Sequence, residues 1–162
     1  MLLKIMLLLN QIIGILLLIL LSPLFLLISL IIVIDNGLPV IFKQKRIGFD
    51  NSEFLLYKFR TMKNNTPDLA SHLLKNTKTY YTSTGPFLRK FSIDELPQIF
   101  NIIKGNMKFI GPRPALFNQE DLIQLRRDKG IDQLTPGITG WAQINGRDDL
   151  DIKEKVDLDF FY

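Results

Sequence analysis

Two adjacent carboxylic acids, Asp94 and Glu95, have the residue types and the surroundings that phosphate or proton chemistry requires. Ser92 and Glu95 have the spacing of a capping box, whereas Pro97 favours a later helix start with Asp94 as the N-cap. Either start places both carboxylates at the positive end of a helix, which stabilises anions and attracts phosphate. Acids at a helix start are also ordinary capping residues, so this segment alone leaves a purely structural role open.

Other reactive side chains are scarce. The 162-residue sequence contains no cysteine and a single histidine, His72. The lack of cysteine excludes disulfides, thiol catalysis and cysteine metal sites, and one histidine makes a Ser-His-Asp triad a poor explanation. We therefore expect any general base to be a carboxylate.

A single arginine stands between two prolines in Gly111-Pro112-Arg113-Pro114. The prolines leave the turn little backbone freedom, and the planar guanidinium suits phosphate oxygens. A lone tetrapeptide of this kind is more often a structural turn. The glycine-rich stretch at residues 135–141 has neither the Walker nor the dinucleotide spacing.

The N-terminal segment, Leu2 to Ile34, is almost entirely aliphatic and indicates a membrane helix. One continuous helix of this length would extend about 50 Å, beyond a hydrocarbon core of about 30 Å. Ser22-Pro23 lies where a break would fall. The segment is either a kinked helix that spans the bilayer or a hairpin that enters and leaves the same leaflet. Basic residues flank it on both sides, at Lys4 and at 43–46, which fits two cytoplasmic ends.

The net charge of +4 is unevenly distributed. Residues 1–119 carry 14 Lys and Arg against 6 Asp and Glu, and residues 120–162 carry 6 against 10. The basic part adjoins the membrane segment and favours anionic lipid head groups. No nucleic-acid-binding motif accompanies it, so we expect no nucleic-acid partner.

The remaining chain, residues 36–162, predicts one small domain after a membrane segment at 1–35. Strand patterns cover residues 40–42, 53–60 and 107–110, and helix patterns cover 69–75, 87–91, 94–103, 116–129 and 152–160. The predicted fold class is therefore α+β, with a membrane-embedded helical hairpin, a small sheet and several short helices.

Four motifs occur together in one order: Lys58-Phe59-Arg60-Thr61-Met62, SIDELPQIFN at 92–101, GPRP at 111–114 and PGITGWAQINGR at 136–147. In order and spacing they resemble the bacterial sugar transferases, the monotopic phosphoglycosyl transferases that begin glycan assembly on a polyprenyl phosphate. The resemblance covers nearly the whole chain, including the proline-broken membrane segment. Four matching motifs are far more specific than any one alone.

The resemblance implies a reaction. Members transfer a sugar-1-phosphate from a UDP-sugar to a polyprenyl phosphate such as undecaprenyl phosphate, and they release UMP. The family's Asp-Glu pair falls on Asp94 and Glu95, with the aspartate as the nucleophile that forms a covalent phosphosugar intermediate. Mg²⁺ held by Asp94 and Glu95 would offset repulsion between anions, and oxygen ligands suit this ion.

The resemblance also implies binding residues and a location. Arg113 matches the family's phosphate-contacting arginine, and Lys58, Arg60 and Arg89 fall in matching basic positions. Ser22-Pro23 matches the family's helix-breaking pair, which favours the re-entrant hairpin over the spanning helix. The expected location is the bacterial cytoplasmic membrane, with the catalytic domain on the cytoplasmic face and in contact with lipid.

Two features depart from the family pattern. Many members carry a basic residue after the threonine that matches Thr82, whereas this chain has Ser83. Members usually continue past the region of Tyr162 through further amphipathic sequence, so we expect this chain to lack that tail. The sugar, the lipid length and the oligomeric state, a homo-oligomer included, stay open.

Two alternatives to the covalent mechanism are kept. In the first, the lipid phosphate attacks the donor directly, and Asp94 and Glu95 serve only as metal ligands. In the second, the chain is a non-catalytic, single-span membrane protein whose basic domain binds anionic lipid or a partner.

Overall fold

The computed structural model of the chain describes residues 2–66, 77–146 and 150–161. The chain contains both helices and strands, which confirms the predicted mixture of both. The helices are α1 (Leu2–Asn36), α2 (Gly85–Lys90), α3 (Ile99–Ile103), α4 (Glu120–Asp128), α5 (Trp141–Ile144) and α6 (Ile152–Phe160). The strands are β1 (Ile41–Ile47), β2 (Glu53–Phe59), β3 (Lys108–Ile110) and β4 (Gly137–Thr139). The helix predicted over 69–75 and His72 lie outside the described residues.

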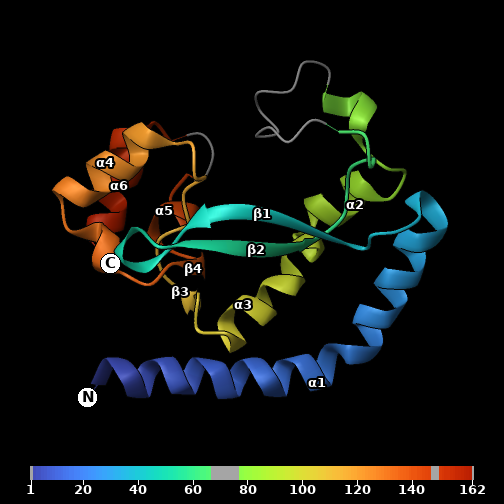
Figure 1. The fold of residues 1–162 in the computed structure, drawn as a ribbon, viewed down its shortest axis with the longest axis horizontal. Coiled ribbons are helices and arrows are strands. Elements are labelled where there is room, and N and C mark those ends of the chain that lie inside the picture. The colour runs from blue at the N-terminus through green and yellow to red at the C-terminus, as the bar shows by residue number, and fades with distance from the viewer. Residues whose placement is uncertain (1, 67–76, 147–149, 162) are drawn as a thin grey trace.

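The apolar N-terminal segment forms one long helix, α1, which is bent part-way along its length (Figure 1). Pro23 is the proline inside this helix, and the Ser22 hydroxyl donates a hydrogen bond to the Ile19 carbonyl at 2.8 Å. We attribute the bend to Pro23, because proline lacks an N–H and its ring clashes with the preceding turn. The two legs diverge rather than lie antiparallel, so the predicted break is a bend within one helix.

The N-terminal leg of α1 runs along the base of the domain and is held there by polar contacts (Figure 1). The Gln11 side-chain amide donates to the Ile103 carbonyl at 3.0 Å, and the Asn10 Oδ1 accepts from the Phe109 N–H at 3.0 Å. Between these residues and the bend, Gly14 allows a close approach, since a Cβ there would lie 3.2 Å from the Ile103 side chain. Two polar residues of this apolar helix, Asn10 and Gln11, therefore face the domain.

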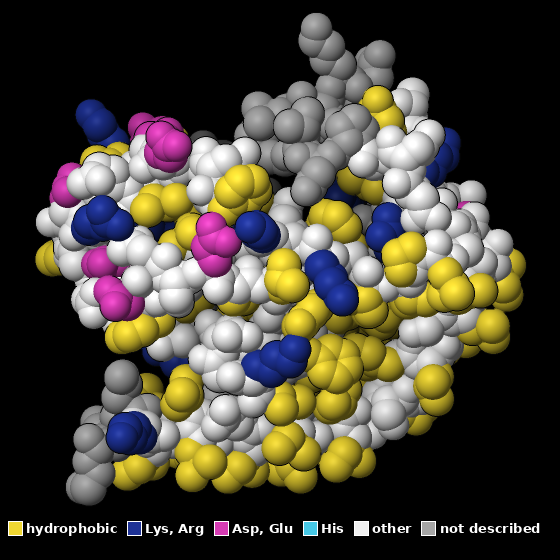
Figure 2. Space-filling model, in the orientation of Figure 1, with side chains coloured by type: hydrophobic (Ala, Val, Ile, Leu, Met, Phe, Trp, Pro, Cys, Tyr) yellow, Lys and Arg dark blue, Asp and Glu magenta, His cyan; other side chains and the backbone are white. Residues whose placement is uncertain are grey.

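The C-terminal leg of α1 supplies part of the domain's own core. Ile28 and Ile32 are buried in one cluster with Phe59 of β2 and Leu88 of α2. Phe25 packs against this cluster, with its ring 5.3 Å from that of Phe59. The rest of the helix surface is apolar and exposed, and Figure 2 shows such side chains along the lower edge, where Figure 1 places α1.

An antiparallel ribbon of β1 and β2 crosses the molecule from the α2 side to the C-terminal helices (Figure 1). Its register pairs Ile41 with Phe59 and Ile47 with Glu53. The prediction of a strand limited to 40–42 was wrong, because pairing with β2 draws the polar segment through Arg46 into the ribbon in spite of its weak strand propensity. Arg46, which lies beyond the predicted strand, is a strand residue.

Strands β3 and β4 form a second, parallel pair, so the single predicted sheet is two small ones. Gly137 lies very close to the backbone at the end of β3. A Cβ at this position would come within 2.2 Å of the Gly111 backbone nitrogen. This close approach fixes the glycine-rich segment beside the Pro-Arg-Pro turn.

Helices α4 and α6 enclose a separate C-terminal cluster of Ala115, Leu122, Ile131 and Val156. The helix predicted from residue 116 begins only at Glu120, because Leu116 forms a β-bridge with Arg46 and its N–H donates to the side chain of Gln119. The helix predicted over 152–160 is confirmed.

Candidate active site

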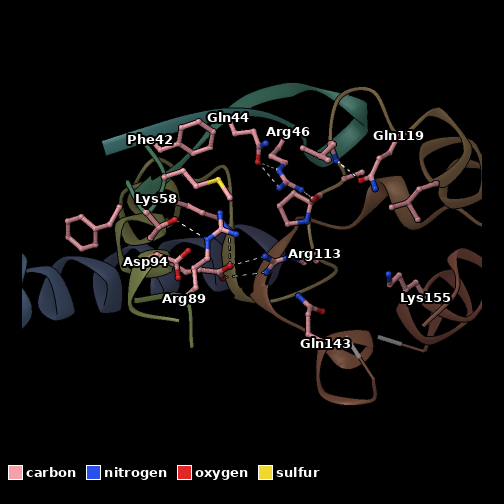
Figure 3. Close-up of a pocket in the computed structure, with 18 of the residues that line it drawn as sticks. Phe42, Gln44, Arg46, Lys58, Arg89, Asp94, Arg113, Gln119, Gln143 and Lys155 are labelled. Atoms are coloured by element: carbon pink, nitrogen blue, oxygen red, sulfur yellow. Dashed lines mark hydrogen bonds and ion pairs between the residues drawn. The ribbon is translucent and has the colours of Figure 1, made fainter. Parts of the chain in front are cut away.

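One cavity of about 920 Å³ opens between the ribbon, the acidic segment and the C-terminal helices. Its wall includes every side chain that the sequence singled out for catalysis or phosphate binding, which are Lys58, Arg60, Arg89, Asp94, Glu95 and Arg113. Figure 3 shows Asp94 and Arg89 at one end of this cavity and Arg113 near its middle. Residues far apart in the chain thus meet in one place, while their individual roles stay predictions.

The acidic segment forms a 3-10 helix, Ile93–Gln98, that continues into α3. Ser92 has a left-handed backbone with a φ of +55° and makes no side-chain cap, so the predicted capping box does not form. Pro97 lies two residues before α3 begins, so α3 makes no use of the N–H that proline lacks. The segment presents both carboxylates to the cavity at the helix start, as expected.

Asn101 of α3 fastens the acidic segment to the ribbon. Its Oδ1 accepts from the Tyr57 N–H at 3.0 Å, and its Nδ2 donates to the Leu55 carbonyl at 2.7 Å. The side chain is fully buried, so these two contacts replace the strand partner that β2 lacks on that side. This role follows from the three-dimensional packing and has no sequence signal.

Glu95 is an ion-paired carboxylate. Its Oε1 lies 2.8 Å from the Lys58 ammonium and 2.8 Å from the Arg113 guanidinium, whose second nitrogen lies 3.4 Å from Oε2. Burial alone would raise the pKa of Glu95, but Lys58 and Arg113 together hold it well below its usual range. Glu95 is therefore a fixed anion that orients two cations along the cavity wall.

Asp94 is equally buried, with 5% of its surface exposed, but its environment is different. Burial raises the pKa of Asp94, Lys58 and Arg89 oppose that rise, and Glu95 adds to it. Within the described residues, no ion pair involves its carboxylate. Asp94 is thus a desolvated carboxylate beside cations that are engaged elsewhere.

Arg89 of α2 is held at the cavity by its neighbours. Its Nε donates to the Thr61 hydroxyl at 2.9 Å, and its guanidinium lies 5.1 Å from the centre of the Tyr81 ring. The start of α2 is fixed from the membrane helix, since Asp35 accepts from the N–H and the hydroxyl of Thr84 at 2.9 and 2.7 Å. The end of α1 therefore helps to place Arg89.

Arg60 and Arg46 also belong to the basic lining. Arg60 donates to the Pro39 carbonyl at 2.8 Å and stacks 6.0 Å from the Phe42 ring. Arg46 donates to the Gln44 side chain at 2.7 Å and to the Pro114 carbonyl at 3.0 Å. Burial, with the nearby Arg113, lowers the pKa of Arg46 to about 10, and Glu95 opposes that shift.

Arg46 was not predicted as a site residue. Phe42, Gln44 and Arg46 alternate along β1 and all line the cavity. Every second residue of a strand points to the same face. A strand predicted to its full length would therefore have placed Arg46 on the same face as Phe42 and Gln44.

Comparison with known proteins assigns the chain to a family. The family model described as "Bacterial sugar transferase" matches residues 3–162. The chain belongs to the bacterial sugar transferase family.

Three relatives show how the similarity is distributed. The chain is 46% identical to the "Uncharacterized sugar transferase EpsL" of Bacillus subtilis (strain 168) over 129 residues, which is 78% of this chain and 61% of that protein. It is 40% identical to the "Undecaprenyl-phosphate glucose phosphotransferase" of Komagataeibacter xylinus over 91% of this chain and 30% of that protein. It is 35% identical to the "Exopolysaccharide production protein ExoY" of Sinorhizobium fredii (strain NBRC 101917 / NGR234), over 94% of this chain and 74% of that protein. The chain thus spans less than two thirds of the first two of these relatives.

In this member of the family the cavity extends past Arg113 to a second polar group on the C-terminal helices. Arg126 of α4 pairs with Asp159 of α6 at 2.5 Å and donates to the Arg113 carbonyl at 2.8 Å. Gln143 of α5 and Lys155 of α6 line the same end (Figure 3). None of these residues was predicted as a site residue, although Gln143 lies within the PGITGWAQINGR motif.

Proposed function

We propose that this chain transfers a sugar-1-phosphate from a UDP-sugar to undecaprenyl phosphate and releases UMP. Family membership supports the reaction class, and the K. xylinus relative is named an undecaprenyl-phosphate glucose phosphotransferase. One observation carries the proposal for this chain. Asp94 is a buried carboxylate that forms no ion pair among the described residues. It lies in a cavity that is lined by cationic side chains and is large enough for a sugar nucleotide.

Asp94 is the proposed nucleophile. A carboxylate oxygen of Asp94 attacks the sugar-side phosphorus of the donor, and the bond from that phosphorus to the bridging oxygen breaks and releases UMP. The acyl phosphate on Asp94 keeps the sugar. An oxygen of the lipid phosphate then attacks the same phosphorus, which transfers the sugar phosphate and restores the carboxylate.

The cations have a clear task in both steps. The reacting groups are anions, and Lys58, Arg89 and Arg113 lie where they would lower the repulsion between them. Glu95 holds two of these side chains in place through its ion pairs. Because Glu95 is occupied in this way, it would act by positioning cations.

Mg²⁺ is proposed as the cofactor. In the described part of the chain no cluster of three or more His, Cys, Asp or Glu side chains is present, so donor phosphates and water would complete the coordination. Asp94 fits such an ion better than Glu95, because both Glu95 oxygens already face Lys58 and Arg113. When bound, the ion would neutralise the diphosphate and stabilise the leaving UMP.

We further propose that α1 is a re-entrant membrane helix with the domain on the cytoplasmic face. The helix is long and apolar enough to cross a bilayer. Both of its legs contact the same domain, however, through Gln11 on one side of Pro23 and Ile32 on the other. A straight spanning helix would carry one leg to the far side and break these contacts. The re-entrant arrangement keeps the cavity near the lipid head groups, where a soluble nucleotide and a lipid phosphate can meet.

The test is an assay of UMP release from a panel of UDP-sugars, with undecaprenyl phosphate and Mg²⁺ in detergent. Release that requires the lipid and is lost in Asp94→Asn is the expected result. Normal turnover in Asp94→Asn would overturn the nucleophile assignment, and no release from any donor would favour a non-catalytic membrane protein.

A further inference from the structure

Arg46 of β1 is a half-buried cation that lines the cavity and donates to neutral groups. Its Nε and Nη2 donate to the Gln44 Oε1 at 3.2 and 2.7 Å, and its Nη1 donates to the Pro114 carbonyl at 3.0 Å. These contacts use one N–H on each nitrogen, so a second N–H remains on Nη1 and on Nη2. Within the described residues, Arg46 forms no ion pair.

Two other arginines of the cavity each have a carboxylate partner. Arg113 pairs with Glu95 at 2.8 Å, and Arg126 pairs with Asp159 at 2.5 Å. Buried charges in folded proteins are paired, because a buried charge without a counterion costs free energy. Burial and the charge of Arg113 also lower the pKa of Arg46. The cavity thus contains a guanidinium whose counterion the described residues do not supply.

A purely structural role does not require this charge. The contacts of Arg46 hold the Pro-Arg-Pro turn against β1, but a neutral amide could also donate to the Pro114 carbonyl. A guanidinium stays charged at any ordinary pH, and its N–H groups suit phosphate oxygens. We therefore expect an anion against the remaining N–H groups of Arg46.

The position of Arg46 indicates which anion this is. Lys58 pairs with Phe42 in the ribbon, and Arg46 lies further along β1 on the same face. Figure 3 shows Asp94 below the Phe42 end of the ribbon, and it shows Arg46 directed toward the cavity near Arg113. In the proposed mechanism the sugar-side phosphate lies against Asp94. The nucleotide-side phosphate, one bridging oxygen away, then extends toward Arg113 and Arg46.

We propose that Arg46 binds the nucleotide-side phosphate of the donor, which is the phosphate that leaves in UMP. The remaining N–H groups of its guanidinium donate to oxygens of this phosphate, while Gln44 holds the guanidinium in place. Together with Arg113, it stabilises the negative charge on the leaving nucleotide. This inference rests on the proposed function for the presence of a UDP-sugar, and it adds a residue that holds the leaving group.

The test compares UMP with uridine, which lacks the phosphate. Binding of each to the full chain in detergent is measured by calorimetry, with Mg²⁺ present throughout. In Arg46→Gln, the affinity for UMP should fall about tenfold, because a charged hydrogen-bond donor is lost. The affinity for uridine should equal that of the wild type, since glutamine can still donate to the Pro114 carbonyl.

Two further variants serve as matched comparisons. Arg46→Lys keeps the charge but not the planar fork, and it should retain part of the UMP affinity that Arg46→Gln loses. Arg127→Gln removes an exposed arginine of α4, and it should bind both ligands like the wild type.

A double variant separates direct contact from an effect on Arg113. In the Arg113→Gln background, Arg46→Gln should still weaken UMP binding, because each side chain contacts the phosphate itself. No further loss in the double variant overturns the inference, since Arg46 would then act only by holding the Pro-Arg-Pro turn.

The other outcomes are also decisive. Unchanged UMP affinity in Arg46→Gln overturns the inference, and so does an equal loss of UMP and uridine affinity, because Arg46 would then be structural. A raised KM for undecaprenyl phosphate at unchanged UMP affinity overturns it too, because Arg46 would then hold the lipid phosphate. A wild-type protein that binds neither UMP nor any UDP-sugar overturns both the proposed function and this inference.

Discussion

Asp94 and Glu95 are neighbours in the chain, but the pKa values of their carboxyl groups are shifted in opposite directions. Burial raises the pKa of Asp94, whereas Lys58 and Arg113 hold that of Glu95 below its usual range against the effect of burial. In the proposed mechanism, the pair therefore divides two tasks between two similar groups. Glu95 organises the cations, and Asp94 is left to react.

A covalent intermediate should be trapped on Asp94. Incubation of the protein with a UDP-sugar labelled in the sugar, without lipid, is expected to label the wild-type chain and to leave Asp94→Asn unlabelled. Intact-protein mass spectrometry measures the adduct, and a chase with undecaprenyl phosphate should remove it. Lipid-dependent turnover without any adduct would favour direct attack by the lipid phosphate.

Removal of the Glu95 carboxylate should destabilise the fold. Glu95→Ala leaves the buried Lys58 ammonium without its partner, which we expect to cost about 3 kcal/mol in the free energy of unfolding. Glu53→Ala is the matched control, because its exposed pair with Lys45 should contribute less than about 1 kcal/mol. Equal losses in the two variants, measured by denaturant unfolding in detergent, would contradict the assigned role of Glu95.

The two carboxylates should also give opposite pH dependence of stability when divalent cations are absent. The folded-state pKa of Glu95 lies below its ordinary 4.5, so its stabilisation is present above pH 4.5 and is lost as the pH falls below it. In Glu95→Gln, the free energy of unfolding should therefore fall less steeply than in the wild type as the pH drops below 4.5. The pKa of Asp94 lies above its ordinary 3.8, so its ionisation destabilises the fold as the pH rises. Asp94→Asn should accordingly be more stable than the wild type at pH 7.

Asp35 should stabilise the start of α2 from the end of the membrane helix. Asp35→Ala removes the acceptor of two Thr84 hydrogen bonds, and a loss of about 1 kcal/mol is typical for such a cap. Thermal unfolding in detergent measures the loss, with Asp128→Ala on the exposed end of α4 as the control. An unchanged midpoint in Asp35→Ala would show that α2 is held by its other contacts.

The bend in α1 should determine on which side the N-terminus lies. In this cysteine-free chain, Lys4→Cys and the control Lys153→Cys are both expected to react with an impermeant maleimide in inverted vesicles and not in intact cells. Adding Pro23→Ala should straighten the helix and expose Lys4→Cys to the outside in part of the population. Labelling of Lys4→Cys from outside without that change would establish a single span.

The sequence predicted the residues of the site more accurately than the helices and strands that position them. Three of the motifs contain Lys58, Arg60, Asp94, Glu95 and Arg113, and the resemblance adds Arg89, because the types of these residues reflect chemistry rather than local conformation. The structure gathers all six side chains around one cavity. The capping box at Ser92 did not form, and the backbone of Ser92 is left-handed instead. Tertiary pairing likewise extended β1 through Arg46, against the local preference of a basic stretch.

Long-range contacts account for what local patterns missed. Asn101 bonds to residues 44 and 46 positions away, and nothing in its neighbourhood marks it as the link between α3 and β2. The local sequence around Asp35 indicates a turn after an apolar helix. Its carboxylate nevertheless accepts a hydrogen bond from the N–H of Thr84 at the start of α2, 49 positions further on. Such roles exist only once the chain is folded.

The contacts of α1 make it an internal wall of the domain as much as an anchor. Ile28 and Ile32 complete the cluster that covers Phe59 and Leu88, and Gln11 satisfies the last carbonyl of α3. Deleting residues 1–36 to obtain a water-soluble fragment would therefore open the core beside β2 and leave α2 uncapped. A water-soluble variant should instead retain the helix. Exposed leucines such as Leu16, Leu20 and Leu26 can be replaced with polar residues for this purpose.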